Sequence, residues 1–107
     1  KDSGYVSPLD DFNRHANVIE MLQMDGWKIS HRTGSRIRLT RPGKDHGTSA
    51  DWDENLRRLY VFTNNSILAM NDPRHALSPV DIFMKREKIN TTHEVRMKLA
   101  DLGYGQI

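Results

Sequence analysis

Cations and small hydroxyl residues gather in one short stretch of this 107-residue chain, between Arg36 and Ser49. Its chemistry-bearing side chains, set among glycines, are Arg36, Arg38, Arg41, Lys44, Thr48 and Ser49. Residues of these types, together with backbone N–H groups, contact the phosphates of nucleic acids. We therefore interpret the stretch as a phosphate-binding surface, and we expect Arg57 and Arg58, just before a later strand, to extend it.

The uneven spread of charge supports this interpretation. The formal net charge is only +2. However, six basic residues and no acid lie between Lys28 and Lys44. A one-sided basic patch on a nearly neutral domain is typical of a surface that faces phosphate. The alternative is a strand face that is simply solvated.

Catalytic motifs are weak in the same stretch. Gly43-Lys44 is not followed by Ser or Thr, so the pattern is not that of a nucleotide-binding P-loop. Ser49, His46 and Asp45 could be drawn as a hydrolytic trio, but no nucleophile elbow or oxyanion-hole motif accompanies them. We expect no catalytic residue in this chain.

Metal and cofactor sites are equally weak in the sequence. The chain has no cysteine, and none of its five histidines has metal-site spacing. A carboxylate cluster could coordinate magnesium, although a solvated acidic loop is the commoner explanation for Asp51, Asp53 and Glu54. We expect neither a metal nor a cofactor.

The elements that must position the basic stretch follow from caps and periodicity. We predict one N-terminal helix from Pro8 to about Asp25, and then a hairpin of strands Trp27–Arg32 and Arg36–Arg41. A long loop, a third strand and two further helices complete the prediction, at Arg41–Arg58, Leu59–Thr63, Val80–Lys88 and Thr92–Leu102. The expected fold class is α+β, with a small three-stranded antiparallel sheet, one N-terminal helix and two C-terminal helices.

Strand alternation assigns the hairpin residues to two faces. We predict Trp27, Ile29 and His31 on the core face, and the opposite face holds Lys28, Ser30, Arg32, Arg36 and Arg38. Trp52, within the long loop, either anchors that loop on the core or stacks on a base.

Residues 1–9 are expected to form a flexible leader, and residues 10–105 a single α+β domain. The first residue is Lys1 rather than Met, so we expect a piece excised from a longer protein. No apolar run is long enough for a membrane span or a secretory signal, so a cytoplasmic location without membrane partners is the default.

The order of motifs resembles a domain of phage and plasmid replication proteins, the primase–polymerases and primase–helicases. The resemblance covers about Asp10 to Gly105 and rests on the Arg41-Pro-Gly-Lys44 loop, the Leu59-Tyr-Val-Phe62 strand, the Ser78-Pro79 helix start and the terminal Gly103-Tyr-Gly105. It implies a role in DNA replication, with other domains of a parent primase as partners.

The layout is also similar, more distantly, to the zinc-ribbon domain of bacterial-type primases, through the helix Pro79-Val-Asp-Ile-Phe-Met84. The family's four zinc ligands fall at positions that cannot bind zinc here, namely Arg41, Lys44, Val61 and Asn64. The resemblance implies a zinc-ribbon-like fold without zinc, held together by packing through Trp27, Trp52 and Phe62. It also implies binding of a single-stranded template, DNA or RNA.

The sequence thus predicts a noncatalytic nucleic-acid-binding module of a phage- or plasmid-type DNA primase or replication protein. A second hypothesis is a docking module that positions catalytic domains through Asp51-Trp52-Asp53 and the last helix. A third hypothesis, a stand-alone hydrolase, would depend on His46 and Asp45.

Overall fold

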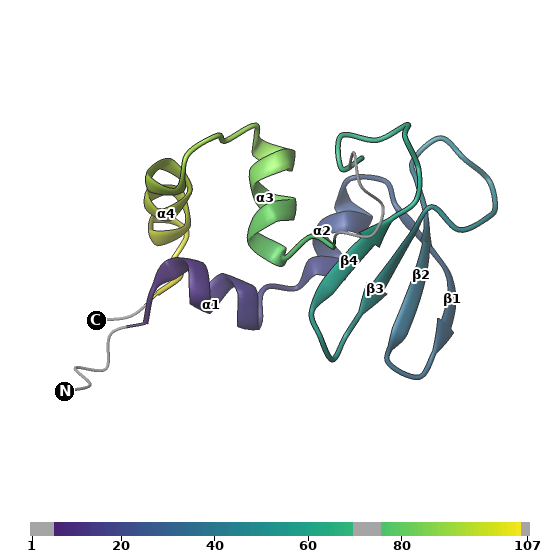
Figure 1. The fold of residues 1–107 in the computed structure, drawn as a ribbon, viewed down its shortest axis with the longest axis horizontal. Helices are drawn as coiled ribbons and strands as arrows, with labels where there is room; N and C mark the ends of the chain where they lie inside the picture. The colour runs from purple at the N-terminus through teal and green to yellow at the C-terminus, as the bar shows by residue number, and fades with distance from the viewer. Residues whose placement is uncertain (1–5, 70–75, 106–107) are drawn as a thin grey trace.

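The computed structural model, which describes residues 6–69 and 76–105, shows four helices on one side of a four-stranded sheet (Figure 1). Two short helices come first, Pro8–His15 (α1) and Val18–Met24 (α2). The strands follow as Lys28–Thr33 (β1), Arg36–Thr40 (β2), Ala50–Asp53 (β3) and Arg58–Val61 (β4). The chain then returns to helix in Pro79–Glu87 (α3) and Thr92–Asp101 (α4). The predicted α+β class and the two C-terminal helices are confirmed.

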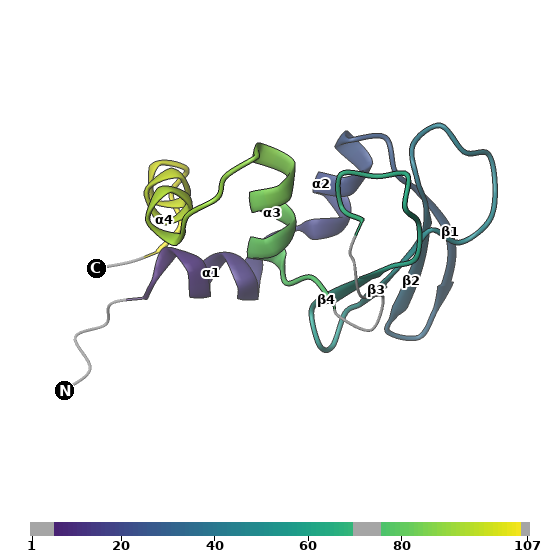
Figure 2. The ribbon, with the colours of Figure 1, turned by 45° about the horizontal axis from the view of Figure 1, so that its top comes forward.

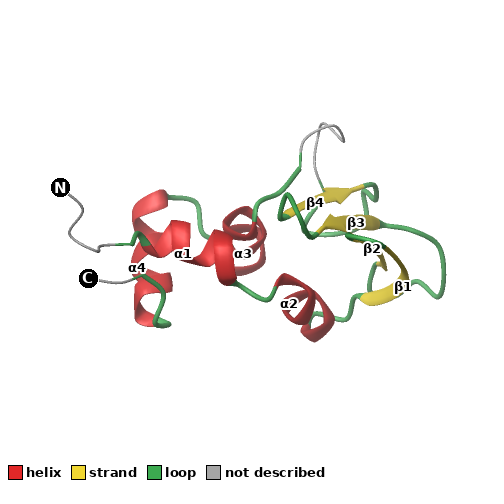
Figure 3. Cartoon of the chain, turned by 90° about the horizontal axis from the view of Figure 1, so that it is seen from below, coloured by secondary structure: helices red, strands yellow, loops and turns green. Residues whose placement is uncertain are grey.

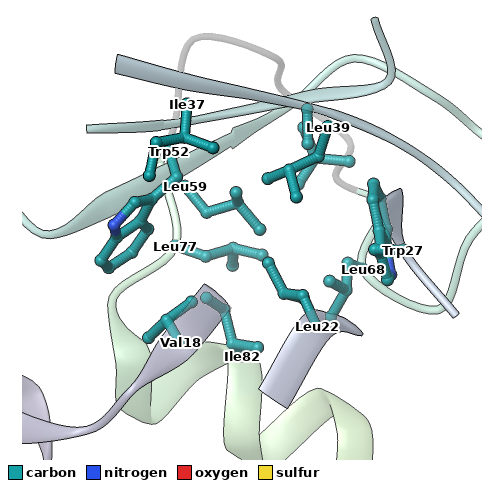
Figure 4. Packing of buried hydrophobic residues seen from close by; sticks show 12 residues of the cluster. Val18, Leu22, Trp27, Ile37, Leu39, Trp52, Leu59, Leu68, Leu77 and Ile82 are labelled. Atoms are coloured by element: carbon teal, nitrogen blue, oxygen red, sulfur yellow. The ribbon is translucent and has the colours of Figure 1, made fainter. Parts of the chain in front are cut away.

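The sheet has the order β1-β2-β3-β4, and each strand is antiparallel to its neighbour. One face of the sheet packs against α2 and α3 (Figure 4). The core side chains come from both layers and are Val18, Leu22, Trp27, Ile37, Leu39, Ala50, Trp52, Leu59, Val61, Leu68, Leu77 and Ile82. Trp52 is only 1% exposed, so the prediction that it anchors its segment on the core is confirmed.

A second apolar cluster joins α1, α3 and α4 beyond the end of the sheet (Figure 2). Its buried members are Phe12, Ala16, Val80, Phe83, Ile89, Val95 and Leu99. Helix α3 belongs to both clusters, because Ile82 lies in the sheet core while Phe83 contacts the ring of Phe12, 5.2 Å between centroids. The described part of the chain is therefore elongated, 48 Å by 30 Å by 25 Å.

The prediction of one N-terminal helix to Asp25 was wrong, because the helix breaks at Ala16-Asn17. Ala16 adopts an extended conformation with ψ 140°. Asn17 caps the next helix, and its side-chain oxygen accepts a hydrogen bond from Glu20 N–H at 3.0 Å. Asparagine is among the preferred residues at a helix N-cap, so the break has a local cause.

The prediction of three strands was also wrong, because the expected loop Arg41–Arg58 contains the central strand β3. Ala50 and Trp52 point into the core, whereas Asp51 and Asp53 point to the opposite face. Aspartate disfavours strands, which hid this alternation. Here both carboxylates pair across the sheet with Arg36, 2.8 Å and 3.9 Å away. The last strand is shorter than predicted and ends at Val61.

A β-bulge in β1 corrects the predicted faces of the hairpin. Ile29 lies opposite Leu39, but His31 lies opposite Arg38, so the register shifts at the residue between them. The shift moves His31 from the core face to the outer face. It moves Arg32 from the outer face to the core face, because Arg32 now lies opposite the buried Ile37.

Three further expectations concern aromatic packing, the N-terminal leader and membrane-spanning segments. Phe62 is 54% exposed, so its predicted role in packing was wrong, whereas Trp27 is buried at 5% exposure as predicted. Pro8 and Leu9 form the first turn of α1, so the predicted leader cannot extend over residues 1–9; residues 1–5 of it lie outside the described residues. None of the described helices has both the length and the apolar character needed to cross a membrane.

Candidate nucleic-acid interface

The face of the sheet opposite the core is the candidate site. The described helices all lie on the other side of the sheet (Figure 3). Strand pairing arranges the outward residues in rows that run across the strands. One row is Thr33, Arg36, Asp53 and Arg58, and the next is His31, Arg38, Asp51 and Tyr60. We call this surface the outer face.

Arg36 is held within the outer face. Its Nη2 donates to Asp51 Oδ2 at 2.8 Å and its Nε donates to Asp51 Oδ1 at 3.3 Å. The hydrogen bond from Arg36 to Asp51, strengthened by their opposite charges, raises the pKa of Arg36 above its ordinary value. Its guanidinium also lies 5.5 Å from the centre of the Tyr60 ring. Because Arg36 is already paired, it is a weaker candidate for phosphate than the sequence indicated.

Arg38 lies near the centre of the outer face, opposite His31 on β1 and Asp51 on β3. Its side chain is exposed and lines a hollow of about 390 Å³ with His31, Thr33, Arg36 and Asp51. Among residues 6–69 and 76–105, no carboxylate lies within ion-pair distance of Arg38 or of Lys28. Two guanidinium groups and one carboxylate line the hollow, so a phosphate there would meet a net positive charge.

The loop between β2 and β3 extends the outer face at one end of the sheet. Thr40 and Ser49, both 2% exposed, fix its two ends. Thr40 Oγ1 donates to the carbonyl of Gly47, and Ser49 Oγ accepts from Arg41 N–H at 3.1 Å. The predicted role of Ser49 as a phosphate contact is therefore replaced by a structural one.

Between these anchors, the loop exposes Lys44 and Thr48. Gly43 and Gly47 have φ angles of +83° and +96°, which glycine adopts far more easily than other residues. Lys44 reaches back over the second glycine, because a Cβ added at Gly47 would lie 3.5 Å from Lys44 Nζ. The loop therefore presents Arg41, Lys44 and Thr48 beside the outer face, as the sequence predicted.

Arg57 and Arg58 diverge although they are neighbours. Arg57 turns to the helices, where Nε donates to Asn13 O at 2.7 Å and Nη2 donates to Ala16 O. Arg58 stays exposed on the outer face, and among the described residues it donates to the carbonyls of its own turn, Leu56 and Arg57. The structure thus places Arg58 beside the other predicted phosphate contacts, whereas it places Arg57 against the helices.

Two residues that the predicted site omitted join it. Lys28 lies opposite Thr40, at the loop end of the outer face, and His31 reaches this face through the bulge. Alternation in the sequence had placed Lys28 on this face without a role in the site, whereas nothing in the sequence signals the bulge. The outer face and loop together hold six Lys or Arg and three Asp, a charge of +3, while the rest of the chain sums to −1.

The described residues assemble neither a metal site nor the docking surface of the second hypothesis at Asp51-Trp52-Asp53. In the described part of the chain, no three His, Asp or Glu side chains come together as a group that could hold a metal ion. Asp51, Trp52 and Asp53 are at most 8% exposed, so they cannot form the docking surface that the second hypothesis assigned to them.

Comparison of the chain with protein-family models, with curated proteins and with solved structures found no match. The geometry of the outer face is therefore the main basis for a functional assignment.

Proposed function

We propose that this chain is a noncatalytic nucleic-acid-binding module, and that it holds a template strand on the outer face of its sheet. The observation that supports the proposal best is the exposure of Arg38 and Lys28, without a carboxylate partner among the described residues, on a face that no described helix covers. Unpaired cations on an open surface attract phosphates and release their counterions on binding.

The loop supplies a second set of contacts in this proposal. Arg41 and Lys44 belong to the loop that leaves β2 beside Thr40, the residue opposite Lys28, and the exposed Thr48 can donate its hydroxyl to a phosphate oxygen. These groups carry no sequence information, because they read the phosphate–sugar backbone and not the base edges. We therefore expect binding with little base-sequence preference.

The parent protein in this proposal is a phage- or plasmid-type DNA primase or another replication protein. The support is the ordered set of motifs between Asp10 and Gly105 that resembles domains of such proteins. In that setting the module would hold the template close to catalytic domains of the same polypeptide.

Salt dependence tests the proposal directly. Fluorescence anisotropy of a labelled single-stranded oligonucleotide is measured between about 50 and 200 mM salt, with the wild type and with the double variant Lys28→Gln/Arg38→Gln. Each phosphate contact on a single strand contributes about 0.7 to the log–log salt slope, so the double variant should lose about 1.4.

The control removes the same charge from the helical part of the chain. Arg96 and Lys98 are exposed on α4, so Arg96→Gln/Lys98→Gln should keep the wild-type slope. An unchanged slope in Lys28→Gln/Arg38→Gln would show that the outer face is not the binding surface. If the wild type fails to bind even at the lowest salt, the nucleic-acid proposal is wrong, and what takes its place is a docking module with the last helix, α4, as its contact surface.

A further inference from the structure

Two aromatic rings lie beside the cations of the outer face. Tyr60 belongs to this face because it lies opposite Asp51. Phe62 follows two residues later, and its N–H donates to Ser49 O at 2.8 Å, which continues the register of β3 and β4 by one pair. Strand alternation therefore places Phe62 on the same face as Tyr60.

The exposure of Phe62 is unusual for this chain. The large aromatic side chains of the two cores are 1% to 5% exposed, at Phe12, Trp27, Trp52 and Phe83. Phe62 is 54% exposed, and it neighbours the basic loop through its bond to Ser49. An exposed aromatic ring that belongs to neither described core cluster and lies beside a basic loop is well suited to stack on a base.

Tyr60 is held in place by the charged network of the sheet. The guanidinium of Arg36 lies over its ring at 5.5 Å from the centroid, and Asp51 fixes that guanidinium with two hydrogen bonds. A ring whose orientation is already fixed loses less conformational freedom when a ligand binds. Tyr60 is therefore a preformed part of the surface.

We propose that Tyr60 and Phe62 form a stacking platform for two unpaired bases, so that the ligand of the outer face is single-stranded nucleic acid. This inference rests on the proposed function and adds the class of ligand. Residues two apart on a strand are separated by about 7 Å, roughly twice the 3.4 Å per nucleotide of a stacked strand. Bases that rest on the two rings must therefore be unstacked from each other.

Duplex nucleic acid cannot use such a platform. In a duplex each base is covered on both faces by its neighbours, and only base edges reach the grooves. A single strand can turn its bases onto the rings while its phosphates follow Arg38, Lys28 and the loop. The cations then provide attraction for any nucleic acid, and the rings provide the preference for unpaired bases.

The test separates bases from phosphates. Three labelled probes of equal length are compared at one salt concentration: oligo(dT), an abasic strand with the same phosphates, and a duplex. Because stacking on an aromatic side chain contributes substantially per base, wild type should bind oligo(dT) roughly 5- to 100-fold more tightly than the abasic strand. Phe62→Ala should lose most of this preference and keep its affinity for the abasic strand.

Matched variants distinguish stacking from general apolar contact. Phe62→Trp should retain the preference, whereas Phe62→Leu should lose it. Met97 on α4 is also 54% exposed, so Met97→Ala removes a similarly exposed apolar side chain elsewhere and should behave as wild type. Thermal unfolding of each variant checks that the fold is intact.

The outcomes separate the two proposals. If no probe binds, the proposed function fails, and this inference fails with it. If all three probes bind equally, with a steep salt dependence, the basic surface stands and the stacking platform is wrong. The platform is also wrong if Phe62→Ala binds oligo(dT) as tightly as the wild type does.

Discussion

Arg57 is the residue whose substitution should have clearly different effects according to the sequence and according to the structure. From the sequence, Arg57 belongs with the phosphate contacts, and its loss should weaken binding without changing stability. In the structure its guanidinium donates to the carbonyl of Asn13, in the last turn of α1, and to the carbonyl of Ala16, the C-cap of that helix. The guanidinium also lies 5.5 Å from the centre of the Trp52 ring. The substitution Arg57→Met keeps a long, unbranched side chain that can pack on Trp52, but it removes both hydrogen-bond donors.

The expected loss can be worked from these contacts. Hydrogen bonds from a charged donor contribute about 1.5 to 3 kcal/mol each, and Arg57 makes two of them while partly exposed, so we expect a total loss of about 2 to 4 kcal/mol. The cation also complements the negative C-terminal end of α1, an effect within that range. For a chain of this length each kcal/mol lowers Tm by roughly 4 to 8 °C, so Tm should fall by at least about 8 °C.

The assay measures urea unfolding and oligonucleotide binding on the same samples. Arg58→Met is the matched control. Among residues 6–69 and 76–105, Arg58 donates to the carbonyls of its own turn, so its substitution should cost less than about 0.5 kcal/mol. Arg57→Met should unfold early yet bind nucleic acid as the wild type does wherever it is folded. Wild-type stability combined with lost binding in Arg57→Met would refute the reasoning and restore the prediction from sequence.

Two further outcomes follow from single carboxylates. Asp51→Asn should release Arg36 and add one charge to the outer face, so we expect tighter binding of the abasic strand, which reports the phosphate contacts alone, with a salt slope steeper by up to about 0.7; weaker binding of that strand would contradict this. Asp11 accepts from Gly105 N–H at 2.7 Å and contacts His15 Nδ1 at 2.8 Å, which lowers the pKa of Asp11. A carboxyl with a lowered pKa stabilises the fold above its unfolded-state value of about 4 and loses that effect as pH falls below it. Asp11→Asn should therefore lower Tm at neutral pH, and the difference from wild type should close as the pH falls below about 4; a constant difference would contradict this.

Local signals in the sequence were enough for most of the elements. Ser78 begins α3 with a capping box, and Thr91 Oγ1 accepts from Glu94 N–H at 3.1 Å at the start of α4, as their residue types predict. The hairpin of β1 and β2 follows from alternation around Gly34. In each case the residues that decide the element are within a few positions of one another.

The break between α1 and α2 has a local cause at Asn17, whereas the errors in the sheet and at the site arose where distant residues decide. Asp51 and Asp53 look like loop residues until Arg36 is brought opposite them by the sheet. The contact of Arg57 with Asn13 spans 44 positions, and no spacing rule in the sequence indicates it. The site was therefore predicted as a region, because its cations are neighbours in the chain, but the role of each side chain was decided by pairing across the sheet.

The acids of β3 explain why the outer face can carry so many cations. Like charges side by side on neighbouring strands repel one another, and without β3 the hairpin would hold its cations uncompensated. Asp51 and Asp53 lie on the inner strand β3 and pair with Arg36, while Arg38 and Lys28 have no carboxylate partner among residues 6–69 and 76–105. The same pairing holds Arg36 against Tyr60. This one ion-pair network thus stabilises the sheet, limits repulsion and orients a ring, so the outer face has the fixed geometry that a binding surface requires.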